Sequence, residues 1–431
     1  MSTQPPNIIF CHVDQLTYDT LSSLGDPWVH TPNIDRIRAE GMSFEIAQGA
    51  YPVCCPARTS WYTGRMSSEH GTWDNAVPIR EDMPDLGHWL RERSYDCYYA
   101  GKWHLVDRDV ADCFIDLYPH RPFGEKDDPH VAQTATAFIA QRPADGNPFF
   151  LNLGFQNPHD ICYTSFGSDN TAMKVGMNGE LEGKLPDLPP TYDPDKPLAA
   201  AASDSWGPDE LRLHNYYYYR MIEMVDQEIG RVYDALADSP FRDNTLFIFS
   251  ADHGEMMGHH NHLRKGLLYE ESLRVPLTFV WPGHIEAGVI DTQHCASGVD
   301  VTATILDYAG AEPMPGMRVA RSLRPFLEGK DTDWREYTPA ETVKGGVQNS
   351  FRDERFKSIF NFERKAVELY DYRADPNETK NLARDPAYAD VLERHLYYIE
   401  DYNTDTVEWS DFYTQELKRR NVVIDRDVFG G

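Results

Sequence analysis

The 431-residue chain lacks any long hydrophobic run. Its most apolar stretches, residues 7–13 and 149–155, are as long as strands and fall far short of the ~18 residues that a membrane-spanning helix needs. The N-terminal Met-Ser-Thr-Gln-Pro-Pro also lacks the basic flank and the apolar core of a secretory signal. We therefore expect no membrane partner, and a cytoplasmic protein as the sequence is written, or an exported one if a leader has been removed.

Basic residues and cysteines are also scarce. The chain has 41 Lys and Arg against 69 Asp and Glu, a formal net charge of -28, which disfavours binding to nucleic acid or to an anionic membrane. A small anionic substrate is not excluded, because a buried site can be locally positive on an acidic protein. Seven cysteines are too few, and odd in number, for a disulfide framework.

What the sequence does contain is an alternation of apolar strands and amphipathic helices. Residues 7–13 and 149–155 are apolar throughout, and residues 208–237 carry apolar side chains at helical spacing. Continuously apolar strands are typical of a sheet that is covered on both faces. We predict an α/β fold over residues 1–345, with a central mixed, mostly parallel sheet flanked by helices. Shorter strands and helices predict a small C-terminal antiparallel-sheet subdomain over residues 346–431.

Polar residues follow two of the predicted strands. Asp14 and Gln15 come after the first strand, and Asp252 and His253 follow the strand at 245–249. Because ligands bind beyond the carboxyl ends of parallel strands, we expect the two pairs to meet there. Carboxylate and amide oxygens suit a hard divalent cation, although a solvated turn would explain either pair taken alone.

The run Cys-Cys-Pro-Ala-Arg over residues 54–58, followed by Thr63-Gly64, is an unusual pattern. Taken alone, it also fits two buried cysteines that precede a helix. Further motifs follow it in the chain: Gly-Lys-Trp-His over 101–104, Asn-Pro-His over 157–159, and Lys265 with Tyr-Glu and Arg-Val-Pro over 269–276. In content and order these motifs resemble those of the type I, formylglycine-dependent sulfatases of the alkaline phosphatase superfamily. The resemblance extends from residue 7 to about residue 385.

The resemblance implies a set of catalytic residues. Cys54 would be oxidised to formylglycine by a maturation enzyme, and one hydroxyl of the hydrated aldehyde would be the nucleophile. Unlike a thiol, a diol can release sulfate by collapsing back to the aldehyde. Arg58 would position the diol, and Lys102 and Lys265 would bind the sulfate. His104 would take a proton from the diol, and His159 would assist the departing alcohol. Asn75 would line the pocket.

The resemblance also implies one divalent cation, held by Asp14, Gln15, Asp252 and His253 next to the modified Cys54. Ca²⁺ is the first choice for the family, and Mn²⁺ is the alternative because one ligand is a histidine nitrogen. Many sulfatases have Asp where Gln15 stands and Asn where His253 stands. Relatives with Gln and His include phosphonate monoester hydrolases.

The implied activity is hydrolysis of a small sulfate monoester, with a sulfated carbohydrate preferred. Tryptophans that can stack on sugar rings and the loop at 161–207 favour a saccharide. One alternative is a phosphonate monoester or phosphodiester hydrolase of the same superfamily. Another is a catalytically silent anion-binding relative in which Cys54 is never oxidised. The sequence does not predict the oligomeric state.

Overall fold

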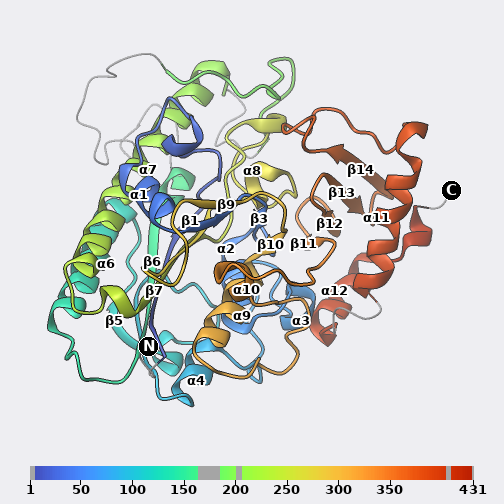
Figure 1. The fold of residues 1–431 in the computed structure, drawn as a ribbon. Helices are drawn as coiled ribbons and strands as arrows, with labels where there is room; N and C mark the ends of the chain where they lie inside the picture. Colours follow the sequence, from blue (N-terminus) through green and yellow to red (C-terminus); the bar gives the residue numbers. More distant parts are fainter. Residues whose placement is uncertain (1–4, 164–184, 200–205, 404–408, 430–431) are drawn as a thin grey trace.

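The computed structural model of the chain describes residues 5–163, 185–199, 206–403 and 409–429. Most of the predicted loop at 161–207 lies outside these ranges. The largest element is an eight-stranded sheet with the order β5-β4-β6-β1-β7-β8-β2-β9 (Figure 1). Its strands are β1 (Asn7–Asp14), β2 (Met42–Phe44), β4 (Asp96–Gly101), β5 (Ile115–Pro119), β6 (Phe149–Pro158), β7 (Thr245–Ala251), β8 (Leu277–Val280) and β9 (Val289–Asp291).

The sheet is mixed and mostly parallel, as the sequence predicts. Strand β1 pairs in parallel with β6 and β7, and β4 pairs in parallel with β5 and β6. Strand β8 runs antiparallel to both β7 and β2. Strands β1, β6 and β7 are buried along their whole length, which explains why their sequences are apolar on both faces.

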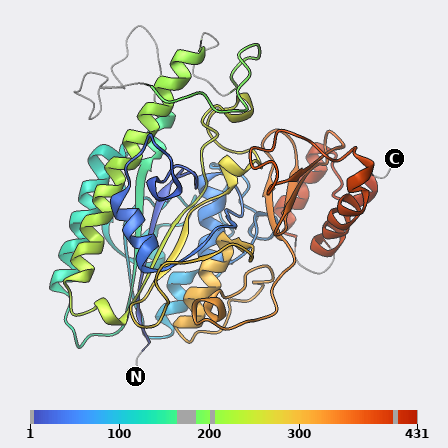
Figure 2. The same ribbon diagram turned by 45° about the horizontal axis from the view of Figure 1, so that its top comes forward.

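Helices cover both faces of this sheet (Figures 1 and 2). Ile9 and Cys11 of β1 belong to one apolar core, and Ile8 and Phe10, which alternate with them, belong to the other, because successive strand residues point to opposite faces. The first core is covered by α1 (Pro32–Glu40), α6 (Gly124–Gln141) and α7 (Pro208–Ala237), and the second by α2 (Cys54–Thr63), α4 (Leu86–Arg91) and α9 (Gly298–Tyr308). Helix α7 confirms the helix predicted at 208–237. Shorter elements are β3 (Ala47–Gln48), which pairs with β10 (Ala296–Ser297), and helices α3 (Ser67–His70), α5 (Val110–Cys113), α8 (Glu270–Leu273) and α10 (Arg324–Leu327).

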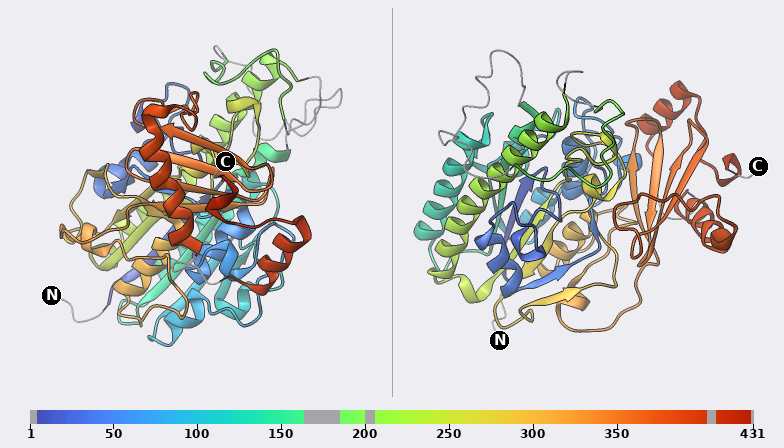
Figure 3. Two further views of the ribbon diagram at one scale, coloured as in Figure 1. Left: turned by 90° about the vertical axis from the view of Figure 1, so that its right-hand side faces the viewer. Right: turned by 90° about the horizontal axis from the view of Figure 1, so that it is seen from above.

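A separate four-stranded antiparallel sheet lies toward the C-terminus (Figure 3). Its strands, in order, are β11 (Thr338–Thr342), β12 (Gln348–Arg352), β13 (Phe356–Asn361) and β14 (Ala366–Asp371). Helices α11 (Ala389–Asp401) and α12 (Asp411–Arg420) follow these strands. The antiparallel sheet confirms the predicted fold class, while the domain boundary at residue 345 stays a prediction. In the described part of the chain, no helix is both long and apolar enough to span a membrane.

Candidate active site and metal centre

The site lies where β1, β7 and α2 converge. Because β1 and β7 are adjacent and parallel, Asp14 and Asp252 emerge at the same edge of the sheet. Cys54 is the first residue of α2, so it lies at the positive end of the helix dipole. The Asn75 side chain caps this end, because its Oδ1 accepts a hydrogen bond from the Cys55 amide at 3.0 Å. Gly64 ends the helix with a left-handed φ of 65°, which accounts for the Thr-Gly of the motif.

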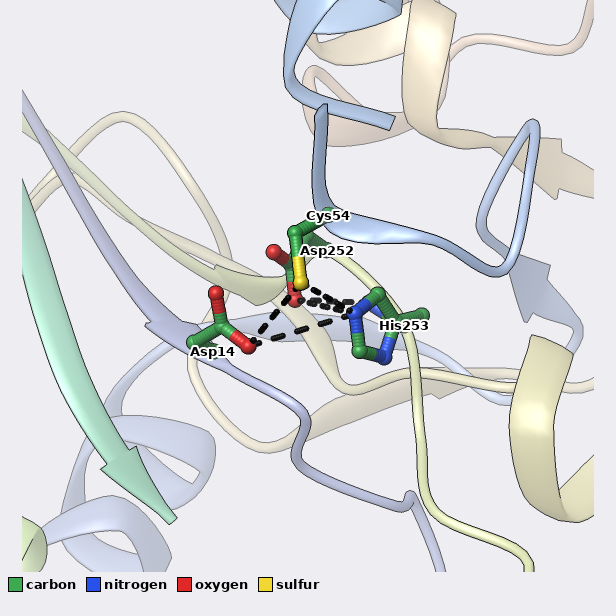
Figure 4. A group of neighbouring side chains, drawn as sticks. All are labelled: Asp14, Cys54, Asp252 and His253. Carbon is green, nitrogen blue, oxygen red and sulfur yellow. Dashed lines mark hydrogen bonds and ion pairs between the residues drawn. The ribbon is translucent and has the colours of Figure 1, made fainter. Parts of the chain in front are cut away.

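Four buried side chains gather at this point. The ligand atoms of Asp14, Cys54, Asp252 and His253 lie within 4.8 Å of one another, and Figure 4 shows the four side chains pointing toward one another. Cys54 Sγ lies 3.2 Å from His253 Nε2 and 3.6 Å from Asp14 Oδ1. The structure therefore brings together residues that are distant in the sequence.

Arg58 holds the two carboxylates in place. Its Nε donates to Asp252 Oδ2 at 3.0 Å and its Nη2 to Asp14 Oδ2 at 3.1 Å, and all three side chains are fully buried. Its Nη1 donates to the Lys102 carbonyl at 2.8 Å, and Lys102 Nζ lies 2.7 Å from Asp14 Oδ2. One oxygen of each carboxylate is thus held by cations, which fixes the orientation of the other.

The second oxygen of each carboxylate is placed to bind a divalent cation together with His253. Oδ1 of Asp14 and Oδ1 of Asp252 lie 3.9 and 3.7 Å from His253 Nε2. His253 Nδ1 lies 2.9 Å from the Gly254 carbonyl, an acceptor that places the proton on Nδ1 and leaves Nε2 free to act as a ligand. A set of carboxylate oxygens with one imidazole nitrogen suits Ca²⁺ or Mn²⁺.

The electrostatics of the cluster also call for a cation. Burial and the charge of Asp14 raise the pKa of Asp252 to about 6. Burial would raise the pKa of Asp14 as well, but Lys102 and Arg58 hold it well below its usual range. Burial lowers the pKa of His253, yet the charges of Asp252 and Cys54 raise it overall. In the metal-free protein, protons therefore take up negative charge that a bound cation would neutralise.

Lys265 and Gln15 form a second group beside the cluster. Lys265 Nζ donates to Gln15 Oε1 and lies 3.7 Å from Cys162 Sγ. The Gln15 side-chain amide donates to Glu255, and its backbone amide donates to Asp252 Oδ1 at 3.0 Å. Burial would lower the pKa of Lys265, but the surrounding cysteines and Asp14 raise it, so the ammonium group stays charged. The sequence analysis identified neither Cys162 nor Glu255, because neither belongs to a recognisable motif.

His159 is held by a glutamine that the sequence analysis also missed. It follows β6, and its Nδ1 lies 2.9 Å from Gln156 Nε2. The amide nitrogen of Gln156 also donates to Asp160 Oδ1 at 3.2 Å, while its oxygen faces His120 Nε2 at 3.2 Å. This orientation makes Nδ1 of His159 an acceptor and places its proton on Nε2. Burial and the charges of Lys102 and Lys265 lower the pKa of His159 to about 3.

His104 lies just beyond the end of β4. Alternation along an extended segment would put Lys102 and His104 on one side, but β4 ends at Gly101 and His104 has a left-handed φ of 58°. Its Nδ1 is buried and has no hydrogen-bond partner among the described residues. The backbone turn, rather than strand alternation, therefore sets the direction of the imidazole.

Comparisons with known proteins identify the family of the chain. The sequence profile of the sulfatase family matches residues 6–311, and that of the N-sulphoglucosamine sulphohydrolase C-terminal region matches residues 258–404. A delta 4,5-hexuronate-2-O-sulfatase of Bacteroides thetaiotaomicron is 27% identical over 93% of this chain and 89% of its own. A multifunctional alkaline phosphatase superfamily protein of Trinickia caryophylli is 27% identical over 94% of this chain and 95% of its own.

The solved structures lead to the same family. A 2-O glycosaminoglycan (GAG) sulfatase superimposes with a TM-score of 0.82 at 25% identity, covering 98% of this chain and 97% of the other. The family profile spans well over half of the sequence, and Asp14, Cys54, Asp252 and His253 converge at one buried site. The chain belongs to the sulfatase family of the alkaline phosphatase superfamily, and it is a sulfuric ester hydrolase.

Proposed function

We propose that the protein hydrolyses the sulfate ester of a sulfated carbohydrate, using a formylglycine made from Cys54 beside one divalent cation. The observation that carries the proposal is the position of Cys54 at the start of α2, within 3.6 Å of both His253 and Asp14. The names of the hexuronate sulfatase and the 2-O GAG sulfatase describe enzymes acting on sugar sulfates, which supports a carbohydrate substrate.

The chemistry needs an oxygen nucleophile and a Lewis acid. The sulfur of Cys54 marks the place of the hydrated aldehyde, which would supply a hydroxyl group to attack the sulfate. Asp14, Gln15, Asp252 and His253 would hold the cation, which when bound supplies positive charge to the sulfate oxygens and the nucleophile. Ca²⁺ remains the first choice and Mn²⁺ the alternative. Arg58 keeps Asp14 and Asp252 oriented for that task.

Two lysines would bind the sulfate group. Lys265 stays cationic and donates to the neutral Gln15 side chain, so a sulfate oxygen can take this hydrogen bond without breaking an ion pair. Lys102 is anchored by Asp14 at 2.7 Å. Fixed cations directed at the oxygens of a transferring group stabilise the transition state without reorganising during the reaction.

The two remaining histidines would have different roles in the reaction. His159 presents an Nε2–H, because Gln156 occupies its Nδ1, and this N–H would donate a hydrogen bond to the departing alcohol oxygen, which stabilises the negative charge that develops there. His104 would take a proton from the second hydroxyl of the diol, which triggers release of sulfate.

The test is a screen of sulfated mono- and disaccharides for released sulfate. Protein co-produced with a formylglycine-generating enzyme should turn over at least one sugar sulfate, whereas Cys54→Ala should not. Cys55→Ala is the matched control, because Cys55 is a buried neighbour whose pKa is raised by burial, and it should retain activity. Activity in Cys54→Ala would contradict the proposed nucleophile.

The second candidate is a phosphonate monoester or phosphodiester hydrolase. It is favoured by Gln15 and His253, which resemble the phosphonate monoester hydrolases at these positions, and by similarity to a multifunctional superfamily member. Rates on aryl phosphonate and aryl sulfate monoesters, measured side by side, would separate the two. A sulfate preference supports the first proposal, and a phosphonate preference supports the second. An inactive protein with an unoxidised Cys54 would favour a silent anion-binding relative.

A further inference from the structure

Two exposed aromatic side chains lie next to His159. Phe123 is 44% exposed and Tyr163 is 46% exposed. Their rings meet edge to face at 5.4 Å, and the Tyr163 ring also meets the His159 ring edge to face at 5.4 Å. The three rings therefore form a continuous row that leads from His159 to the surface. A single exposed aromatic residue needs no explanation, but a contiguous pair beside a reactive group is typical of a binding surface.

The backbone at Phe123 is held in a conformation that a bulky residue rarely adopts. Its φ is 76° and its ψ is 99°, outside the regions favoured for a residue with a side chain. The cause is the attachment of α6 to the end of β6: the Asp128 carboxylate accepts hydrogen bonds from the Gln156 and Asn157 amides at 2.7 and 3.0 Å. A Cβ on Gly124 would lie only 2.7 Å from Asn157, so the chain has no room to relax.

This strain is not needed to bury the Phe123 ring, since nearly half of the side chain is exposed. Strained backbone that places a side chain in solvent beside an active site suggests a functional role. The row also has polar neighbours. Asp160 and His120 both contact Gln156, the residue that holds His159. A site that combines an aromatic surface with nearby hydrogen-bonding groups fits a ligand with one apolar face and several hydroxyl groups.

We propose that Phe123 and Tyr163 form the subsite for the leaving group, binding the apolar C–H face of the pyranose ring whose alcohol oxygen departs beside His159. This inference rests on the proposed function, because it takes His159 as the group that faces the departing oxygen. Aromatic rings carry negative charge on their faces, so they attract the C–H groups of a sugar. The row would orient the sugar, while the lysines and the cation bind the sulfate.

The test separates binding of the sugar from binding of sulfate. Phe123→Ala and Tyr163→Ala should each raise KM for a sulfated disaccharide about tenfold, the effect expected for losing the contact area of one ring. Inhibition by inorganic sulfate, which lacks the sugar, should change less than about twofold. Tyr397→Ala is the matched control, since Tyr397 is 54% exposed on α11, and its KM should equal that of the wild type.

Each other outcome overturns a defined part of the inference. An unchanged KM in both variants, with an active wild type, would refute the subsite and leave the proposed function standing. If inhibition by inorganic sulfate weakened as much as KM rose, the rings would only support the catalytic cluster and would not bind the sugar. A KM that rises for aryl sulfates but not for sugar sulfates would refute the assignment of the subsite to a pyranose ring. A wild type that releases no sulfate from any sugar ester would refute the proposed function together with the inference.

A second variant distinguishes a functional ring from a structural one. Phe123→Gly removes the side chain and suits the left-handed backbone, so it should raise or preserve the thermal midpoint while raising KM for the sugar ester. If the ring instead stabilises the fold, Phe123→Gly should lower the midpoint and leave KM unchanged, which would overturn the subsite.

Discussion

Replacing Arg58 by methionine tests whether its guanidinium group stabilises the two buried carboxylates, Asp14 and Asp252, in the folded protein. Methionine is similar in length, flexible and uncharged. The change removes both ion pairs, at 3.0 Å to Asp252 and 3.1 Å to Asp14, and leaves Lys102 as the remaining cation in contact with Asp14. Removing one partner of a buried ion pair costs about 3–5 kcal/mol. The metal-free variant should therefore lose about that much free energy of unfolding.

Urea unfolding followed by tryptophan fluorescence measures this loss, and Trp61, whose ring lies 5.9 Å from the Arg58 guanidinium, is a local reporter. Adding Ca²⁺ or Mn²⁺ should restore part of the stability, because a cation supplies charge to the same carboxylates and binds only the folded state. Arg58→Lys should be intermediate, since an ammonium group keeps the charge but cannot span both carboxylates.

The control is Arg80→Met, which removes an exposed ion pair with Asp82 and should cost less than about 1 kcal/mol. If metal-free Arg58→Met unfolds within about 1 kcal/mol of the wild type, the two carboxylates do not depend on Arg58. That result would refute the account of how the cluster is held.

Three further predictions follow from the same geometry. Lys265→Ala should slow turnover by about 10²–10³-fold, the usual effect of losing one oxyanion donor; unchanged kcat/KM would place Lys265 outside the sulfate site. Asp252→Asn should weaken binding of the cation measured by calorimetry, and unchanged affinity would remove its role as a ligand. Because the pKa of Asp252 is raised to about 6 in the metal-free protein, cation affinity should fall as the pH drops below 6, where a proton competes with the metal. Equal affinity at pH 5 and pH 7 would contradict this competition. The pH dependence of folding stability has the opposite direction. Because the pKa of Asp252 lies above its usual 3.8 in the folded state, this carboxyl group destabilises the metal-free fold above pH 6, and the destabilisation disappears as the pH falls toward 4.

The parts of the fold predicted correctly carry strong local signals. Strands β1, β6 and β7 are predominantly apolar on both faces, and α7 has a regular helical period over 30 residues. Helix α6 was not predicted. Its first turns are charged and contain Pro129, and the helical spacing of apolar residues at Val131, Ala132, Ala135 and Ile139 begins only after that proline. Packing against α7 and the sheet stabilises the whole helix.

The candidate site was partly predictable for a related reason. The ends of parallel strands share one edge of a sheet, so the meeting of Asp14 with Asp252 follows from the strand assignment alone. The left-handed φ of 71° at Gln15 does not follow from sequence, and neither do its contacts with Lys265 and Glu255. Gln156, which sets the tautomer of His159, belongs to no motif, because its role depends on tertiary distances rather than on spacing.

The central claim is that Cys54 becomes the nucleophile, and mass spectrometry of the Cys54 peptide from a fully active sample tests it most directly. The account predicts a peptide about 18 Da lighter than the unmodified sequence, as expected for formylglycine. An intact thiol at Cys54 throughout a fully active sample would contradict it.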